Sequence, residues 1–106
     1  MPGYHVVRLG QAAMIWADHA LERSVARELL DTLDILLTEA ATPLVIDLVR
    51  VPSVDPEVVA VLATAVTTAA SAGGKLELRL AGDRRFTVRD AAQLRHALTL
   101  AYPKAA

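Results

Sequence analysis

One stretch, from Pro43 to Gly74, constrains the fold of this chain more than any other. It opens with a dense apolar run from Leu44 to Leu48, which predicts a buried strand. After a short connector, Asp55-Pro56-Glu57 offers a helix-capping residue, a first-turn proline and an acid at the positive end of the helix dipole. Gly73-Gly74 predicts the end of that helix. A buried strand therefore leads into a helix N-terminus, and a functional site is expected at the corner from Ser53 to Glu57.

The rest of the chain predicts a single α/β domain over residues 1–106, with elements in the order β-β-α-β-α-β-α. Two strands, over 4–9 and 12–17, form a hairpin, and strict alternation predicts another strand over 75–80. An apolar stripe starting near Asp18 predicts a helix of about 18 residues. Residues 81–86 are expected to form a turn, and Thr87 with Asp90 to cap the last helix. Right-handed crossovers make the last three strands parallel, in a mixed sheet of about four strands packed against helices.

The strand over 44–49 is apolar at every position except Asp47, which predicts a central strand covered on both faces. A carboxylate inside such a strand needs hydrogen-bond donors. We therefore interpret Asp47 as a structural residue that accepts backbone N–H bonds from the connector after it.

Composition excludes several classes of protein. The chain contains no cysteine, and its three histidines show no metal-ligand spacing, so neither a metal nor another cofactor is expected. A formal net charge of −1 argues against nucleic-acid binding. The halves differ, at −5 for residues 1–60 and +4 for residues 61–106, and we expect these charges to intermix when the halves pack. We also expect no signal peptide and no membrane-spanning helix, and hence a cytoplasmic protein.

The predicted second helix has an unusual outer side. No charged residue occurs from Val58 to Gly74. A solvated helix usually carries lysine or glutamate on its outer face, whereas a surface of small side chains and hydroxyls lets another protein approach closely. Its predicted outer positions are Ala60, Ala63, Thr64, Thr67, Thr68 and Ser71. The alternative is that another helix of the same domain covers them.

These segments resemble the STAS domain of anti-sigma factor antagonists and of sulfate-transporter tails. The resemblance rests on Val45-Ile46-Asp47-Leu48, on Val54-Asp55 before a helix, and on Gly73-Gly74 before Lys75-Leu76. It implies the fold derived above. In the antagonists a serine directly after the second aspartate is phosphorylated by an anti-sigma kinase, and the unphosphorylated form binds that kinase.

At the decisive position this chain departs from the antagonist pattern. Asp55 matches, but Pro56 stands where the phosphorylated serine belongs, and Glu57 and Val58 replace the next hydroxyl and the glycine. Proline has no hydroxyl, so the usual switch site cannot be phosphorylated. Either the domain binds its partner without a switch, which we favour, or Glu57 imitates the phosphorylated state.

The resemblance implies a protein-interaction module. Since the sequence contains no catalytic motif, we expect this module to be non-enzymatic. Its expected partner is an anti-sigma-factor-like kinase or another regulatory protein, through a surface made of Ser53, Val54, Ala60, Thr64, Thr67 and Thr68. One alternative is a STAS subunit of a lipid-transport complex, which would contact a transporter ATPase. Another is a small-molecule-binding STAS domain, which would need a pocket lined by Asp47, Asp55 or a histidine. The sequence also leaves room for a homodimer.

Overall fold

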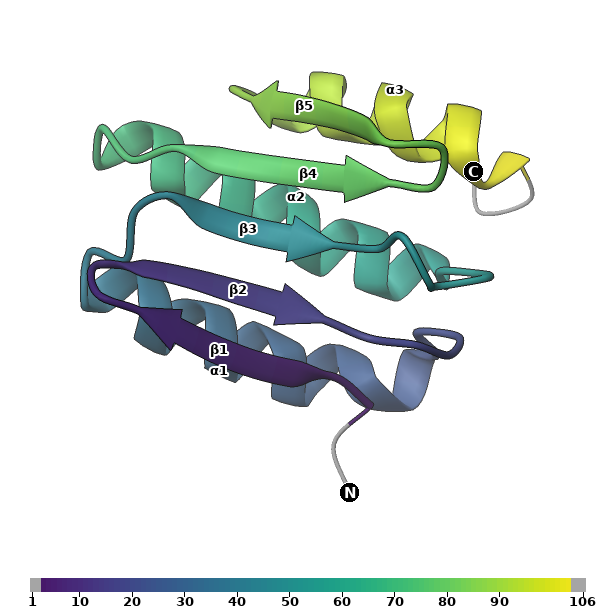
Figure 1. The fold of residues 1–106 in the computed structure, drawn as a ribbon, viewed down its shortest axis with the longest axis horizontal. Coiled ribbons are helices and arrows are strands. Elements are labelled where there is room, and N and C mark those ends of the chain that lie inside the picture. Colours follow the sequence, from purple (N-terminus) through teal and green to yellow (C-terminus); the bar gives the residue numbers. More distant parts are fainter. Residues whose placement is uncertain (1–2, 104–106) are drawn as a thin grey trace.

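Five strands form one sheet whose spatial order follows the chain (Figure 1). The structure is a computed structural model that describes residues 3–103. Its elements, in chain order, are β1 (His5–Leu9), β2 (Ala12–Trp16), the 3-10 turn η1 (Arg23–Val25), α1 (Ala26–Thr38), β3 (Leu44–Asp47), α2 (Pro56–Ser71), β4 (Leu76–Leu80), β5 (Arg84–Val88) and α3 (Ala91–Ala101).

The pairing of the strands confirms the predicted α/β class. β1 and β2 form the expected antiparallel hairpin, with His5 opposite Trp16 and Leu9 opposite Ala12. β2, β3 and β4 are parallel, as the strand–helix–strand connections require. β5 closes the sheet in antiparallel pairing with β4.

β5 is a strand that the sequence pattern did not predict. The turn before it is shorter than the expected 81–86. Leu80 pairs with Arg84, which leaves a three-residue loop in which Gly82 (φ 79°) and Asp83 (φ 57°) both adopt the left-handed conformation. Thr87 consequently lies in β5 and does not cap a helix. Asp90 alone is the N-cap residue of α3, and its carboxylate accepts the Gln93 N–H at 2.7 Å.

The first helix begins later than predicted. α1 starts at Ala26, after the η1 turn, although the apolar stripe extends back to Leu21. Leu21 is buried for a different reason. Its backbone forms an isolated parallel bridge with Val54, so its side chain enters the core from an extended segment.

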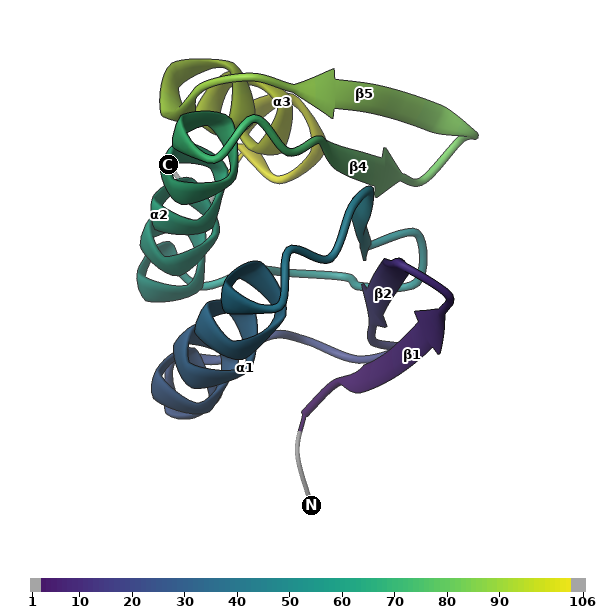
Figure 2. The same ribbon diagram turned by 90° about the vertical axis from the view of Figure 1, so that its left-hand side faces the viewer.

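Within residues 3–103, the three helices lie on one face of the sheet and leave the other face open (Figure 2). The prediction that β3 is covered on both sides is therefore wrong. Ile46 (1% exposed) points toward the helices, and its neighbour Val45 points to the open face. Val45 is nevertheless only 7% exposed, because Met14 and Glu77 flank it in the neighbouring strands. The core lies between sheet and helices and includes Leu29, Leu33, Leu44, Ile46, Leu62, Leu76, Leu78, Leu94 and Leu98.

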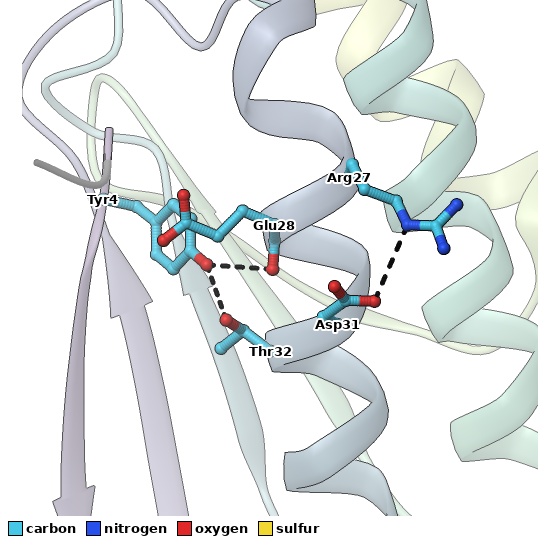
Figure 3. Close-up of polar contacts among 5 residues, drawn as sticks. All are labelled: Tyr4, Arg27, Glu28, Asp31 and Thr32. Carbon is cyan, nitrogen blue, oxygen red and sulfur yellow. Dashed lines mark hydrogen bonds and ion pairs between the residues drawn. The ribbon is translucent and has the colours of Figure 1, made fainter.

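The start of β1 is fastened to α1 by a buried tyrosine (Figure 3). The Tyr4 hydroxyl donates to the Glu28 carbonyl at 3.1 Å and lies 2.5 Å from the Thr32 hydroxyl. Burial raises the pKa of Tyr4, an effect that the hydrogen bond with Thr32 partly opposes. On the exposed side of α1, Arg27 and Asp31 form only a loose ion pair at 3.9 Å, a type that contributes little to stability.

The charges of the two halves do not intermix, contrary to the expectation from sequence. Because sheet order equals chain order, β1, β2 and α1 lie at one end of the molecule and β5 and α3 at the other (Figure 1). The acidic and the basic halves of the sequence are thus kept apart in space.

Candidate functional site

The corner from Ser53 to Glu57 follows a connector that a tyrosine holds in place. β3 ends at Asp47, and the chain then runs across the ends of the strands to α2. The Tyr102 hydroxyl, from the end of α3, lies 2.7 Å from the Val51 carbonyl and 3.2 Å from the Leu48 carbonyl. Burial of this hydroxyl raises the pKa of Tyr102, because the phenolate form would lose its hydration.

Asp55 links the corner to the η1 turn, 32 residues away in sequence. Its carboxylate accepts the Arg23 N–H at 2.7 Å. Its own N–H donates to the Leu21 carbonyl at 3.0 Å, and the Leu21 N–H donates to the Ser53 carbonyl at 3.0 Å. Asp55 occupies the N-cap position of α2 as expected, but its side chain makes no capping bond to that helix. The carboxylate therefore joins two segments rather than capping one helix.

Pro56 and Glu57 form the exposed first turn of α2. Pro56 stands at the first helical position, where its missing N–H costs nothing. The Glu57 carboxylate lies 3.2 Å from the Arg23 guanidinium. Arg23 is thus held at its N–H by Asp55 and at its side chain by Glu57, which ties the corner to η1 at two points.

The outer side of α2 is exposed, and no other helix of the described chain covers it. Ala60, Thr64, Thr67 and Thr68 are all exposed. Ala63 is an exception to the predicted outer set, since it is only 5% exposed. Val54, expected on the partner surface, is 3% exposed and belongs to the core, so its side chain is not available to a partner.

Each hydroxyl on this side of α2 donates to the carbonyl four residues earlier. Thr64 donates to Ala60 at 3.1 Å, Thr67 to Ala63 at 3.2 Å, Thr68 to Thr64 at 3.1 Å and Ser71 to Thr67 at 3.0 Å. The hydroxyl donors are therefore satisfied within the helix. What remains outward is a surface of small side chains without charge.

The residues interpreted as structural have clear contacts. One oxygen of Asp47 accepts the Val49 N–H at 3.0 Å, at the start of the connector. Gly73 has φ 74° at the end of α2. The Gly73 N–H bonds the Ala70 carbonyl at 3.1 Å, and the Gly74 N–H bonds the Ala69 carbonyl at 2.9 Å, the two bonds of a Schellman motif.

Two hollows adjoin the corner. One, of about 590 Å³, lies toward η1 and is lined by Arg23, Arg27, Ser53, Asp55 and Glu57 among others. The other, of about 410 Å³, lies toward the end of α3 and is lined by residues 52–56 together with Ala101, Tyr102 and Pro103. Exposed Ser53 borders both, so it is accessible from either side.

Neither of the two hollows at the corner is lined by a histidine. Among residues 3–103, no three His, Asp or Glu side chains gather as metal ligands would. His19 lies 2.9 Å from the Asp18 carboxylate, and this hydrogen bond lowers the pKa of Asp18. None of the helices in these residues is long and apolar enough to cross a membrane.

Sequence reasoning missed two residues of the corner, Arg23 and Tyr102. Arg23 falls within the helix predicted from Asp18, and nothing in its local pattern indicates that Asp55 and Glu57 lie beside it. Tyr102 had a weak signal, since it is one of two tyrosines in the chain and ends the last helix next to a proline.

Comparison with known proteins supports the fold and the family. The structure of the anti-sigma factor antagonist SpoIIAA in its unphosphorylated form matches with a TM-score of 0.65 at 12% identity, over 71% of this chain and 70% of that protein. The structure of Mglu matches with a TM-score of 0.60 at 24% identity, over 70% of this chain but only 18% of that protein. At these identities the likeness concerns the fold alone. No curated protein matches this sequence significantly.

The family evidence covers almost the whole chain. The family model described as "Mlab, STAS domain" matches residues 5–101, from the first residue of β1 to the last of α3. This match confirms the resemblance seen in the strand, corner and glycine segments. The chain belongs to the Mlab-type STAS domain family.

Proposed function

We propose that this domain is a non-enzymatic protein-interaction module whose contact surface joins the corner from Ser53 to Glu57 with the exposed side of α2. The observation that carries the proposal is the state of the α2 hydroxyls. All four donate to carbonyls of their own helix, and no charged residue occurs on the helix after Glu57.

The desolvation of such a surface by a binding partner costs little free energy. Burying an unpaired hydroxyl costs about 1–3 kcal/mol, and burying an unpaired charge costs more. Thr64, Thr67 and Thr68 avoid the first cost because their donors are already bonded. Their small size also allows a partner backbone to come close.

The contact we propose is constitutive. Pro56 offers no hydroxyl for a kinase, and Glu57 and Asp55 are both engaged with Arg23. A Glu57 carboxylate held by an arginine is a weaker imitation of phosphate than a free one. We infer a protein partner of the anti-sigma kinase type, and a cytoplasmic location where such a partner occurs.

Arginine substitutions on α2 test the surface. Thr64→Arg or Thr67→Arg places a long charged side chain at the proposed interface and should weaken capture of the native partner at least tenfold. Thr99→Arg is the matched control, because Thr99 is also exposed and also donates to a carbonyl four residues earlier, but on α3. Equal capture by all three variants would contradict the proposal.

The identity of the captured protein is the second readout. Tagged wild-type domain is retrieved from its native cells, and the proteins that Thr64→Arg loses are identified by mass spectrometry. A histidine-kinase-like ATPase supports the regulatory module. A transporter ATPase would assign the domain to a lipid-transport complex through the same surface.

Phosphate transfer tests the missing switch. A cognate anti-sigma kinase with radiolabelled ATP should leave the wild-type corner unlabelled, whereas Pro56→Ser should gain label if the kinase still docks. Label on Ser53 of the wild type would overturn the constitutive contact.

A further inference from the structure

A second site is suggested on the open face of the sheet, on the opposite side from the helices (Figure 2). A pocket of about 350 Å³ lies there at the carboxyl ends of β2 and β3. Its lining consists of Met14, Trp16, Ala17, Asp47, Val49 and Arg50.

The pocket contains two opposite charges that do not neutralise each other. Asp47 uses one oxygen for the Val49 N–H, and the other oxygen makes no hydrogen bond within residues 3–103. Arg50 is exposed and forms neither a hydrogen bond nor an ion pair with that part of the chain. The two side chains line the same pocket without forming an ion pair. Arg79 is the cross-strand neighbour of Asp47, but its guanidinium pairs with Glu77 at 3.6 Å, so Asp47 and Arg50 are both left for a ligand group.

The rest of the pocket wall is apolar and partly fixed. Trp16 is half-buried, and its indole stacks on the His5 ring with centroids 4.3 Å apart and planes 25° apart. This stacking covers one side of the indole and restrains its rotation. Met14 and the 43% exposed Val49 add further apolar surface.

We propose that this pocket binds a small zwitterion. Its ammonium group bonds the free oxygen of Asp47, its carboxylate or phosphate bonds the Arg50 guanidinium, and its apolar part lies against Trp16 and Met14. A simple anion would meet the charge of Asp47 and a simple cation the charge of Arg50, so only a ligand with both charges satisfies both residues. The volume is within the range of small-molecule sites.

The proposal concerns a face that the partner surface on α2 does not use. A ligand in the pocket would nevertheless contact Asp47, at the end of β3, and Arg50, in the connector that leads to the corner. The two sites can be tested separately, because Thr64→Arg should leave ligand binding unchanged even if it abolishes partner capture.

Trp16 provides the assay, since it is the only tryptophan of the chain. L-Leucine and O-phosphoethanolamine are titrated while Trp16 fluorescence is recorded; they represent amino acids and lipid headgroups, respectively. A saturable change with either one supports the site and identifies the source of the zwitterion. N-acetyl-leucine and leucine amide each lack one charge and should bind at least tenfold more weakly than leucine where leucine binds. No saturable change with either zwitterion would overturn the proposal.

Two variants assign the charges. Arg50→Gln changes an exposed side chain and should weaken zwitterion binding at least tenfold. Asp47→Asn can still accept the Val49 N–H, and it should remove the preference of the site for the zwitterion over its N-acetylated analogue. Arg85→Gln is the control, because Arg85 lies in the same cross-strand row of the open face, two strands beyond Asp47. Circular dichroism verifies the fold of each variant, and unchanged zwitterion binding in both pocket variants would refute the assignment.

Discussion

The C-terminal ends of α1 and α2 allow a matched test of what the left-handed backbone conformation costs in free energy of unfolding. Both end in a Schellman motif, which places one residue in the left-handed region. In α2 that residue is Gly73, at φ 74°. In α1 it is Ala40, at φ 57°, whose N–H bonds the Leu37 carbonyl at 3.0 Å. We expect Ala40→Gly to stabilise the protein and Gly73→Ala to destabilise it.

The size of the effect follows from two opposing terms. A left-handed conformation costs an alanine about 1–2 kcal/mol, which Ala40→Gly removes. The added glycine makes the unfolded chain more flexible, which costs roughly 0.4–1 kcal/mol. The net gain is therefore about 0.5–1 kcal/mol. At Gly73 a new Cβ would have no atom within 4 Å, so Gly73→Ala carries the conformational cost without a clash and should lose a similar amount.

Urea unfolding followed by circular dichroism measures both changes, and thermal melting should show shifts of roughly 2–8 °C in opposite directions. Ala60→Gly is the control, since Ala60 is exposed within α2 and glycine there should destabilise by about 1 kcal/mol. If Ala40→Gly were as destabilising as Ala60→Gly, the left-handed assignment of Ala40 would be refuted.

Further predictions concern the hydroxyls and carboxylates that hold segments together. Tyr102→Phe should lower the free energy of unfolding by about 1 kcal/mol in urea titration, because it removes the bonds to the connector. The raised pKa values of Tyr4 and Tyr102 mean that the folded state disfavours their phenolates. The free energy of unfolding should therefore be at its full value below about pH 10 and fall as the pH rises through the pKa values of the folded state. The fall should be smaller in a Tyr4→Phe, Tyr102→Phe double variant. Asp55→Ala should lower the free energy of unfolding by about 1–2 kcal/mol and speed hydrogen exchange of the Arg23 amide. Asp55→Asn should retain part of the hydrogen bond from the Arg23 N–H. Asp90→Ala should cost about 1 kcal/mol in thermal unfolding, and an unchanged melting temperature would refute its capping role.

Local signals predicted the parts of the fold that depend on neighbouring residues. The start of α2 at Pro56 and its termination just before Gly73 were readable because caps are built from a few consecutive residues. The alternation over Lys75 to Leu80 likewise indicated which side of β4 is buried. β5 was missed because Arg84 and Arg85 resemble a solvated turn, although the glycine in the three residues before them is a signal for a short hairpin loop.

The remaining errors arise from contacts between distant segments. Leu21 fits a helical stripe, but its burial comes from the bridge to Val54, which no local pattern reveals. Val45 suggested a second helical layer, yet side chains on neighbouring strands bury it. In the site, the role of Arg23 depends on Asp55 and Glu57, which only the folded chain brings beside it.

The agreement between sheet order and chain order has a consequence for synthesis of the protein. Each strand pairs with the strand made just before it, so a chain emerging from the ribosome can add strands at one growing edge without waiting for a distant partner. Only the two hairpins, β1–β2 and β4–β5, are joined by short loops, and such local contacts favour rapid folding. Until β5 and α3 emerge, the incomplete sheet would expose the edge of β4 and its leucines, which makes the last quarter of the chain the stage at which a stalled product is most prone to aggregate.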